Sequence, residues 1–445
     1  MDIRNRAPTP FPGRRFMRRL LLLYSAFIVY GSFIPFHFNF DPVFLKWRLG
    51  RFLTKSLGRG LRHFSTLDVI CNVLLFAVFG FLWSAVFERA RARSVIGAVL
   101  RVGAIGLLFG FAIELAQTTS PYRDASMLDA LCNGLGAVLG VVAGQFVLRD
   151  YSLSPAGMSL RFLRERPWIF LLIFLVLPPL ADALFPYQIS LNIGTAWAKV
   201  RTSSLIPFGG GLHEPWLELL VERLLCFGAI GYVLRRTLKT LSPIGAIGVT
   251  WLIGGVLAVL VETVKLFVIG RTFEIDNLVL CSTGTLLGAL VIPGLASLKI
   301  ARRSAKEILV LLAIGLIGYS ELMPFDWIYT NELPTKMAFI EWLPFKAYFF
   351  SNPLFAAFDM GKKLYVSIPL GFVLAAQVSS PKVRLYRATL LGSMIGVVLE
   401  TSQIALRSRT PSVTDVLLIG FGSWLGAVAF EYFISSDQSN VDVFQ

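Results

Sequence analysis

The chain has 445 residues, of which 55% are hydrophobic and only 16% charged, and its formal net charge is +15. This composition lies outside the range of soluble globular domains and indicates a protein of the lipid bilayer. The positive charge does not indicate nucleic-acid binding, because Lys and Arg fall between long apolar runs and do not cluster in one region. We therefore expect no nucleic-acid partner.

The apolar runs predict an all-α, polytopic transmembrane helical bundle. A helix needs about 20 apolar residues to cross about 30 Å of hydrocarbon, and about twelve such spans can be placed. The first follows an Arg-rich stretch without a small-residue cleavage site, so we expect a retained span and not a cleaved signal. The predicted spans are 17–36, 68–87, 96–118, 127–148, 168–186, 216–234, 243–268, 276–296, 307–324, 362–378, 388–406 and 413–434.

The basic residues between the spans predict the topology. If the N-terminus is inside, every inner connection is rich in Lys or Arg, as the positive-inside rule requires. We therefore expect a multi-pass protein of the plasma (inner) membrane with both termini in the cytoplasm. The basic residues of the inner connections are Arg89, Arg91, Arg93, Arg149, Arg161, Arg164, Arg166, Arg235, Arg236, Lys239, Lys299, Arg302, Arg303, Lys306, Lys382, Arg384 and Arg387.

One predicted outer connection, residues 40–62, is also basic. Its Lys and Arg residues alternate with apolar ones, as where Lys46 precedes Trp47 and Arg51 precedes Phe52. This pattern predicts an amphipathic helix on the outer surface, where anionic lipid headgroups would hold it. A solvated basic loop is the alternative. Membrane lipids are therefore expected partners.

An internal repeat organises the chain. Residues after Glu114 recur without a gap at the same offsets after Glu400, and a middle copy starting at Glu262 keeps fewer of them. The first and third copies share Gln117 and Gln403, Arg123 and Arg409, Ser126 and Ser412, Asp129 and Asp415, Gly136 and Gly422, and Gly140 and Gly426. The middle copy retains Arg271, Gly284 and Gly288 but substitutes Lys265, Glu274 and Asn277, with Asp276 next to the last of these.

A second correspondence lies earlier in each copy. Asp68, Asn72 and Gly80 match Asp359, Lys363 and Gly371, and the middle copy has Leu219, Arg223 and Gly231. Pro35, Pro186 and Pro324 each end the first span of a copy, and the two later copies add a Pro-Phe pair at Pro207 and Pro344. We expect three four-helix units at 1–150, 151–300 and 301–436, the second degenerate, followed by a tail at 437–445.

The polar residues of a copy are predicted to meet at the outer leaflet. Gln117 lies one turn after Glu114, Asn133 lies one turn after Asp129, and Asp68 opens a helix on the same side. Ionisable residues at membrane depth usually face a bundle interior, pair with each other or line a water-filled cavity. The candidate ligand-binding residues are Glu114, Gln117, Arg123, Asp129, Asn133, Asp68, Asn72, Glu400, Gln403, Arg409, Asp415, Asp359, Glu262 and Arg271.

A structural role competes with this functional one. Ser126 with Asp129, and Ser412 with Asp415, fit the S-x-x-D capping box that opens a helix. Arg123 could neutralise a neighbouring acid and pin the hairpin.

The remaining residues divide into two groups. The two glutamates are expected to be functional, whereas the glycines and cysteines are expected to be structural. Glu114 and Glu400 are expected to cap nothing, which favours a functional role for them. The G-x-x-x-G glycines indicate close helix packing. Four residues are expected to be small, buried thiols: Cys71, Cys132, Cys226 and Cys281.

These motifs resemble the VanZ-like domain of bacterial membrane proteins, named after a component associated with resistance to the glycopeptide teicoplanin. The first copy carries the resemblance in DVICNVLLFAVFGF followed by Glu114, Gln117, Arg123, Ser126, Asp129, Asn133 and Gly136. The third copy has Lys363 and Ile419 where the first has asparagines, and the middle copy is a weaker match. The resemblance implies a membrane location and a cell-envelope context, either glycopeptide resistance or surface polysaccharide. It says less about which reaction, if any, the protein carries out.

Three functions remain open. The first is non-enzymatic binding or shielding of a lipid-linked glycan or peptidoglycan precursor at the outer leaflet. The second is transport or flipping of an envelope precursor, which repeated units with buried polar residues would suit. The third is catalysis on a lipid phosphate with Glu114 or Asp129 as acid or base. It is the least favoured, because no catalytic motif, cofactor site or metal-ligand cluster repeats with the copies.

Overall fold

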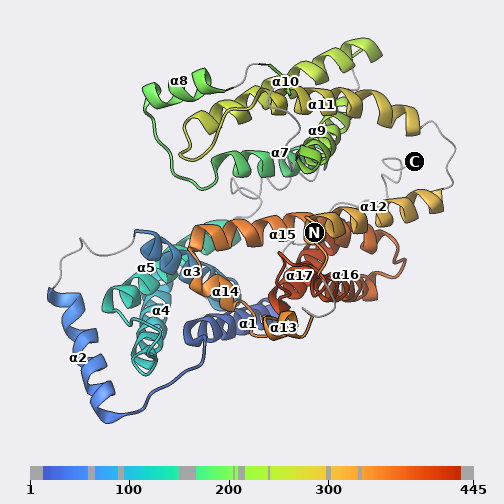
Figure 1. The fold of residues 1–445 in the computed structure, drawn as a ribbon. Helices are drawn as coiled ribbons and strands as arrows, with labels where there is room; N and C mark the ends of the chain where they lie inside the picture. The colour runs from blue at the N-terminus through green and yellow to red at the C-terminus, as the bar shows by residue number, and fades with distance from the viewer. Residues whose placement is uncertain are drawn as a thin grey trace. The chain divides into compact units, whose positions relative to one another are not determined.

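A computed structural model describes residues 14–58, 66–88, 95–149, 167–203, 206–208, 216–238, 241–296, 302–328 and 333–431. Throughout these ranges the regular elements are helices, joined by isolated bridges and turns (Figure 1). The predicted all-α class is thus confirmed. Several basic residues of the predicted connections, and the predicted tail, lie outside the described ranges: Arg59, Arg62, Arg89, Arg91, Arg93, Arg161, Arg164, Arg166, Lys239, Lys299 and residues 437–445.

Twelve of the helices correspond in order to the predicted spans. They are α1 (Arg14–Phe33), α3 (Thr66–Trp83) with its π-helical end η2 (Ser84–Glu88), α4 (Val95–Gln117), α5 (Met127–Arg149), α7 (Pro167–Leu184), α9 (Trp216–Thr237), α10 (Pro243–Leu266), α11 (Ile275–Ala296), α12 (Arg302–Leu322), α15 (Pro353–Ala376), α16 (Pro381–Gln403) and α17 (Val413–Phe430). Both α15 and α16 begin earlier than predicted. Among the described residues, six helices are long and apolar enough to cross a membrane, namely α1, α3 with η2, α4, α5, α10 and α17. The chain is a polytopic membrane protein, and a count of about twelve spans stays a prediction.

Shorter helices lie in the connections after the first span of each copy. They are α2 (Pro42–Gly58) in the first copy, α8 (Ile193–Thr202) in the middle copy, and α13 (Leu333–Ala338) with α14 (Lys346–Phe350) in the third. Helix α2 confirms that the basic segment after the first span is helical. Its Phe52 is buried against Phe111 of α4, while Trp47 is exposed, so one side of the helix packs on α4 and another is open.

The first span of every copy ends in the same way. Helices α1, α7 and α12 stop just before Pro35, Pro186 and Pro324, as predicted, and each of these prolines follows a cis peptide bond. The next residue, Phe36, Tyr187 or Phe325, has a positive φ of 64°, 64° or 61°. A β-carbon disfavours this left-handed region, so the surrounding contacts have to hold the turn in place.

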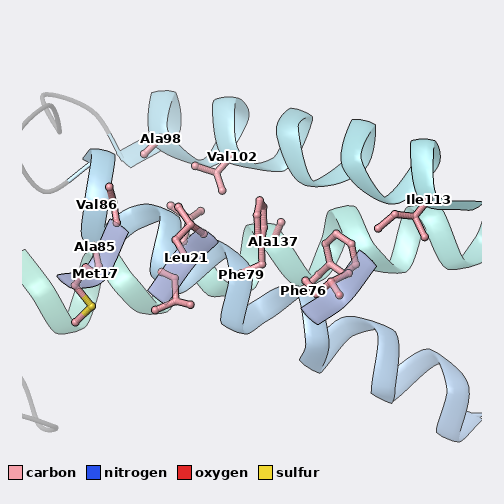
Figure 2. Packing of buried hydrophobic residues seen from close by; sticks show 13 residues of the cluster. Met17, Leu21, Phe76, Phe79, Ala85, Val86, Ala98, Val102, Ile113 and Ala137 are labelled. Carbon is pink, nitrogen blue, oxygen red and sulfur yellow. The ribbon is translucent and has the colours of Figure 1, made fainter. Parts of the chain in front are cut away.

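The chain forms two compact units. The first comprises residues 1–161 together with 345–353, and the second comprises 162–344 and 354–445. Figure 2 shows the core of the first unit, where apolar side chains of α1, α3, α4 and α5 point toward one another. Phe76 and Phe79 of α3 lie at its centre with Leu21, Val102 and Ala137, all of them buried.

Helix α14 comes from the third copy but belongs to the first compact unit, where it lies among the blue helices in Figure 1. The ring of Phe345 contacts Phe27 edge-on at 5.4 Å between centroids, and Phe349 lies 6.2 Å from the same ring. Gly31 of α1 leaves the room that Phe349 fills, because a β-carbon at Gly31 would overlap its ring. The third copy therefore contributes an aromatic segment to the packing of the first.

Close glycine contacts set the same register in every copy. A β-carbon at Gly80, Gly231 or Gly371 would overlap the carbonyl of Ala137, Thr285 or Ser423 on the last helix of that copy. The predicted G-x-x-x-G glycines meet the second helix of the copy in return, as Gly140 meets the carbonyl of Ala77. Close approach of backbones is the usual basis of helix association in lipid, so the predicted packing role is confirmed.

Gly371→Val tests this contact against a matched control on the same helix. We expect it to destabilise the protein by about 1–3 kcal/mol, the usual cost of overpacking, because the added side chain meets the backbone of Ser423. Gly361→Val should have little effect, since nothing lies within 4 Å of a β-carbon there. Thermal unfolding of the full-length protein in detergent measures both. An equal loss of stability in the two variants would contradict the packing role.

Candidate ligand-binding site

A buried glutamate links the last two helices of each copy. The Glu114 carboxylate, near the end of α4, accepts a hydrogen bond at 2.8 Å from the backbone amide of Ser126, just before α5. Glu400 accepts one at 2.7 Å from Ser412. In the middle copy, Glu262 accepts one at 3.2 Å from the Glu274 amide. The expectation that Glu114 and Glu400 cap nothing is therefore wrong, because each satisfies an amide at the entry to the next helix.

The predicted capping boxes are present in a modified form. The Ser126 hydroxyl accepts from the Leu128 amide at 3.2 Å, and the Ser412 hydroxyl accepts from the Thr414 amide at 3.1 Å. In a capping box the acidic residue of the helix accepts from the serine's own amide. Here that amide donates to the glutamate of the preceding helix, so the glutamate takes over a role that the sequence assigned to the aspartate.

The arginine of each hairpin binds backbone carbonyls at the end of the first span. The Nε of Arg123 donates to Ile34 O at 3.2 Å and its Nη2 to Gly31 O at 2.8 Å. Burial lowers the pKa of Arg123 from its ordinary value, and the nearby Glu114 carboxylate opposes this shift. A guanidinium stays charged in proteins, so it can serve as a permanent donor here.

The other two copies repeat this arginine contact at equivalent carbonyls. Arg271 donates to Phe185 O and Asp182 O, and Arg409 donates to Met323 O at 2.6 Å and Ser320 O at 3.1 Å. In each copy one acceptor directly precedes the cis-proline. The structural alternative for the arginine, pinning of the hairpin, is thus present in all three copies.

A second basic residue, missed in the sequence, holds the hairpin turn from the other side. Arg48 of α2 donates to Ser120 O at 3.1 Å, Lys199 of α8 to Val268 O at 2.6 Å, and Lys336 of α13 to Arg407 O at 2.9 Å. These three carbonyls lie in the turn that follows the helix, and the cations supply hydrogen-bond donors to them. A single basic residue in a connecting helix carries no sequence signal for such a contact.

The glutamine of the hairpin helix also reaches the first span. The Nε2 of Gln117 donates to Ser32 O at 2.9 Å, and that of Gln403 donates to Glu321 O at 3.2 Å and to Glu400 Oε1 at 3.1 Å. In the middle copy, Lys265 occupies this place and forms an ion pair with Glu262 at 2.6 Å.

Three buried carboxylates meet in the third copy. Oxygens of Glu321, Glu400 and Asp415 lie within 4.8 Å of one another. Lys363 of α15 supplies positive charge, because its Nζ pairs with Asp415 and lies 3.4 Å from Asp359. Glu321 was not predicted as a site residue, because the other copies have Ser32 and Ala183 at this position. The acid is therefore not part of the repeated pattern.

The acids of the middle copy have basic partners within the chain. Asp182 of α7 forms ion pairs with Arg223 at 3.1 Å and Arg271 at 2.9 Å. Asp276, next to the position of the lost aspartate, accepts a hydrogen bond at 2.7 Å from the amide of Phe208, which lies in the connection between α8 and α9. The degenerate copy thus uses its polar residues for internal links.

The first copy brings its predicted polar residues to the same end of its helices. Glu114 and Asn133 are 6% and 3% exposed, whereas Asp68 is exposed and Asn72 and Asp129 are partly buried. Within the described part of the chain, the Oδ1 atom of Asn133 is buried and makes no hydrogen bond.

The sequence model of the VanZ/LLP1 family matches the chain three times, at residues 20–148, 168–298 and 307–434. The chain belongs to the VanZ/LLP1 family. Three tandem VanZ-like copies are thereby confirmed, including the degenerate middle one. No curated protein and no solved structure matches the chain.

The VanZ-like site is mainly a set of hydrogen-bond acceptors, and carboxylate and amide oxygens favour ammonium groups, hydroxyls or cations as ligands. The ring of His37 lies edge-on to Tyr122, beside Arg123, at 5.5 Å between centroids. It also lies 3.2 Å from Pro35 O. Its described contacts are therefore with the first VanZ-like hairpin turn and the end of the first span, and not with Glu114.

The hydrogen bond between the Ser126 amide and Glu114 can be tested with variants that separate the acceptor oxygen of Glu114 from its negative charge. Glu114→Ala should cost about 1–3 kcal/mol, because it leaves the buried Ser126 amide without a partner. Glu114→Gln should keep most of the stability, since its side-chain carbonyl can accept the same bond. Leu115→Ala, on the neighbouring exposed position, is the control for loss of side-chain size. Denaturation of the purified protein gives all three values, and equal losses for Ala and Gln would refute the amide contact as the main role.

Proposed function

We propose that this VanZ-like protein binds a lipid-linked or glycan component of the bacterial cell envelope at the outer leaflet of the inner membrane. It would act by binding or shielding and not by catalysis. One observation carries the proposal: every copy gathers buried polar side chains at its hairpin end, and in the first two copies a helix with exposed tryptophan and arginine lies beside that end.

The connecting helices have the composition of a membrane interface. Trp47 of α2 and Trp197 of α8 are both 56% exposed. Each has an arginine one turn later, Arg51 or Arg201, whose Cζ lies 5.4 or 5.5 Å from the tryptophan ring. Tryptophan is enriched at the headgroup level, and basic residues there attract anionic lipids. These helices support a hairpin end at the depth of lipid headgroups.

The hydrogen bonds favour binding over the other two functions. The hairpin arginines donate to backbone carbonyls and the glutamates accept from backbone amides, so both are fixed in place and suited to a preformed binding surface. A transport route would favour polar groups near the bilayer midplane. Catalysis would need an acid or base aimed at a reacting group, and the described contacts of Glu114 and Glu400 are structural.

The proposal can be tested with lipid-linked cell-wall precursor and the purified full-length protein. The double variant Glu114→Gln, Glu400→Gln retains both amide acceptors but removes both charges, and we expect it to bind roughly tenfold more weakly, a loss of about 1.4 kcal/mol. Glu307→Gln, an exposed position near the other end of α12, is the matched control. Wild-type affinity in the double variant would remove these carboxylates from the binding role.

The shared orientation of the copies has its own test. Single cysteines at Tyr122, Ile269 and Ser408, all exposed beside a hairpin arginine, are introduced after the native cysteines are replaced by alanine. We expect a membrane-impermeant maleimide to label all three in intact cells. A cysteine at Leu241, in the connection between α9 and α10, should react only after lysis. Labelling of the three hairpins from opposite faces would refute the proposed topology.

A further inference from the structure

The chain leaves the first span of every copy in an extended segment in which apolar residues alternate with others. Large apolar side chains stand at the first, third and fifth positions after the proline that ends the span. We call these positions the apolar ladder. They are Phe36, Phe38 and Phe40 in the first copy, Tyr187, Ile189 and Leu191 in the middle copy, and Phe325, Trp327 and Tyr329 in the third. Tyr329 lies outside the described residues, and the others are all 36–81% exposed.

The hairpin turn holds the opposite side of each segment. The carboxylate of Asp326, which lies between two ladder positions, accepts a hydrogen bond from the Ser408 amide at 2.9 Å. The ring of His37, between two other ladder positions, lies against Tyr122. Successive side chains of an extended chain point to opposite sides, so the ladder points away from the turn. The backbone bonds between segment and turn are Asn39 N to Thr119 O at 2.7 Å, Ile269 N to Gln188 O at 2.8 Å, and Arg407 N to Asp326 O at 2.8 Å.

The position of the ladder next to a membrane span points to lipid. The apolar helix α1 ends at Phe33, and the ladder begins three residues later. Phe38 and Phe40 stack at 6.3 Å between ring centroids, so the exposed apolar surface is contiguous. It continues into the connecting helices, where Val43 and Ile193 are 76% and 78% exposed. Large exposed apolar surfaces mark contacts with membranes, ligands or other proteins, and aromatic residues are enriched where hydrocarbon meets water.

Differences between the copies favour lipid over a sugar as the contact. The middle copy has Ile189 and Leu191 where the first has phenylalanines. A sugar ring stacks on a flat aromatic face, which isoleucine and leucine lack, whereas a lipid contact requires only an apolar side chain. The middle copy also keeps the ladder although Lys265 and Asn277 have replaced the glutamine and aspartate of its hairpin. The ladder is therefore independent of the polar residues that would select a ligand.

We propose that the apolar ladder of each copy inserts into the bilayer interface on the side of the hairpin turns. Its partner is the phospholipid surface, where apolar side chains of interfacial segments reach about 5–10 Å into the boundary between headgroups and acyl chains. The hydrogen bonds between segment and turn then hold the polar residues of the hairpin at headgroup depth. This inference goes beyond the proposed function, because it does not depend on which ligand the hairpin end binds.

Spin labels can measure the depth of the ladder in full-length protein. The four native cysteines are replaced by alanine, and single cysteines at Phe38, Ile189 or Trp327 are labelled with a nitroxide in phosphatidylcholine nanodiscs. Collision with oxygen, which concentrates in hydrocarbon, is compared with collision with a water-soluble nickel chelate, and labelled lipids calibrate the depth. We expect all three labels to lie about 5–10 Å below the headgroup surface.

A label at Gln188 is the matched control, because this exposed residue neighbours Ile189 on the other side of the same segment. It should collide with nickel more often than the Ile189 label. Equal nickel collision at these two positions, or water-like values at any of the three ladder positions, would overturn the proposal. If a cysteine prevents folding, Phe40, Leu191 or Phe325 takes its place in the same copy.

An exchange of residues between copies separates lipid from sugar. Trp327→Ile and Ile189→Trp keep the ladder apolar, so both variants should retain the affinity of wild type for lipid-linked precursor. A loss of at least roughly tenfold in Trp327→Ile would assign the ladder to a sugar and overturn the lipid contact. Wild-type protein that binds no precursor would contradict the proposed function alone, since the depth of the labels is measured without precursor.

Discussion

The hydrogen bond from a buried glutamate to a backbone amide twelve residues later is the contact on which the hairpin end of every copy depends. Backbone groups at membrane depth need partners within the protein, because lipid offers none. The glutamate binds an amide at the start of one helix, and the hairpin arginine binds carbonyls at the end of the first span. A basic residue of the connecting helix binds a carbonyl of the hairpin turn. Three charged side chains thus supply hydrogen-bond partners for the backbone at and around the hairpin turn.

Much of this architecture could be predicted from the sequence. Apolar length located twelve helices, Pro35 and its counterparts marked where first spans end, and the repeat grouped Glu114, Arg123 and Asp129 at one end of a copy. The partners of those residues could not be predicted. The amide bound by Glu114 belongs to the next helix, and periodicity within one helix carries no information about it. Glu321 and Lys363 likewise became visible as neighbours of Asp415 only once three helices were packed together.

The copies differ mainly in how they balance the same negative charge. Removing one partner of a buried ion pair leaves an uncompensated charge and is strongly destabilising, so acids and cations at such positions are expected to change together. The middle copy follows this rule, since it has Lys265 beside Glu262 and Arg223 beside Asp182. The third copy follows it with Lys363. The first copy has Asn72 at the position of Lys363.

The aromatic segment around α14 gives a physical reason for joining the copies in one chain. Phe345 and Phe349 pack on Phe27 of the first copy, and Arg123 lies 5.7 Å from the rings of both Phe349 and Phe350. As a separate protein, such a short segment would bind weakly, because ordering it and restricting its motion costs free energy. On the same chain its effective concentration is high and the contact forms without a partner in solution. The arginine that pins the first hairpin is thus also contacted by aromatic rings of the third copy.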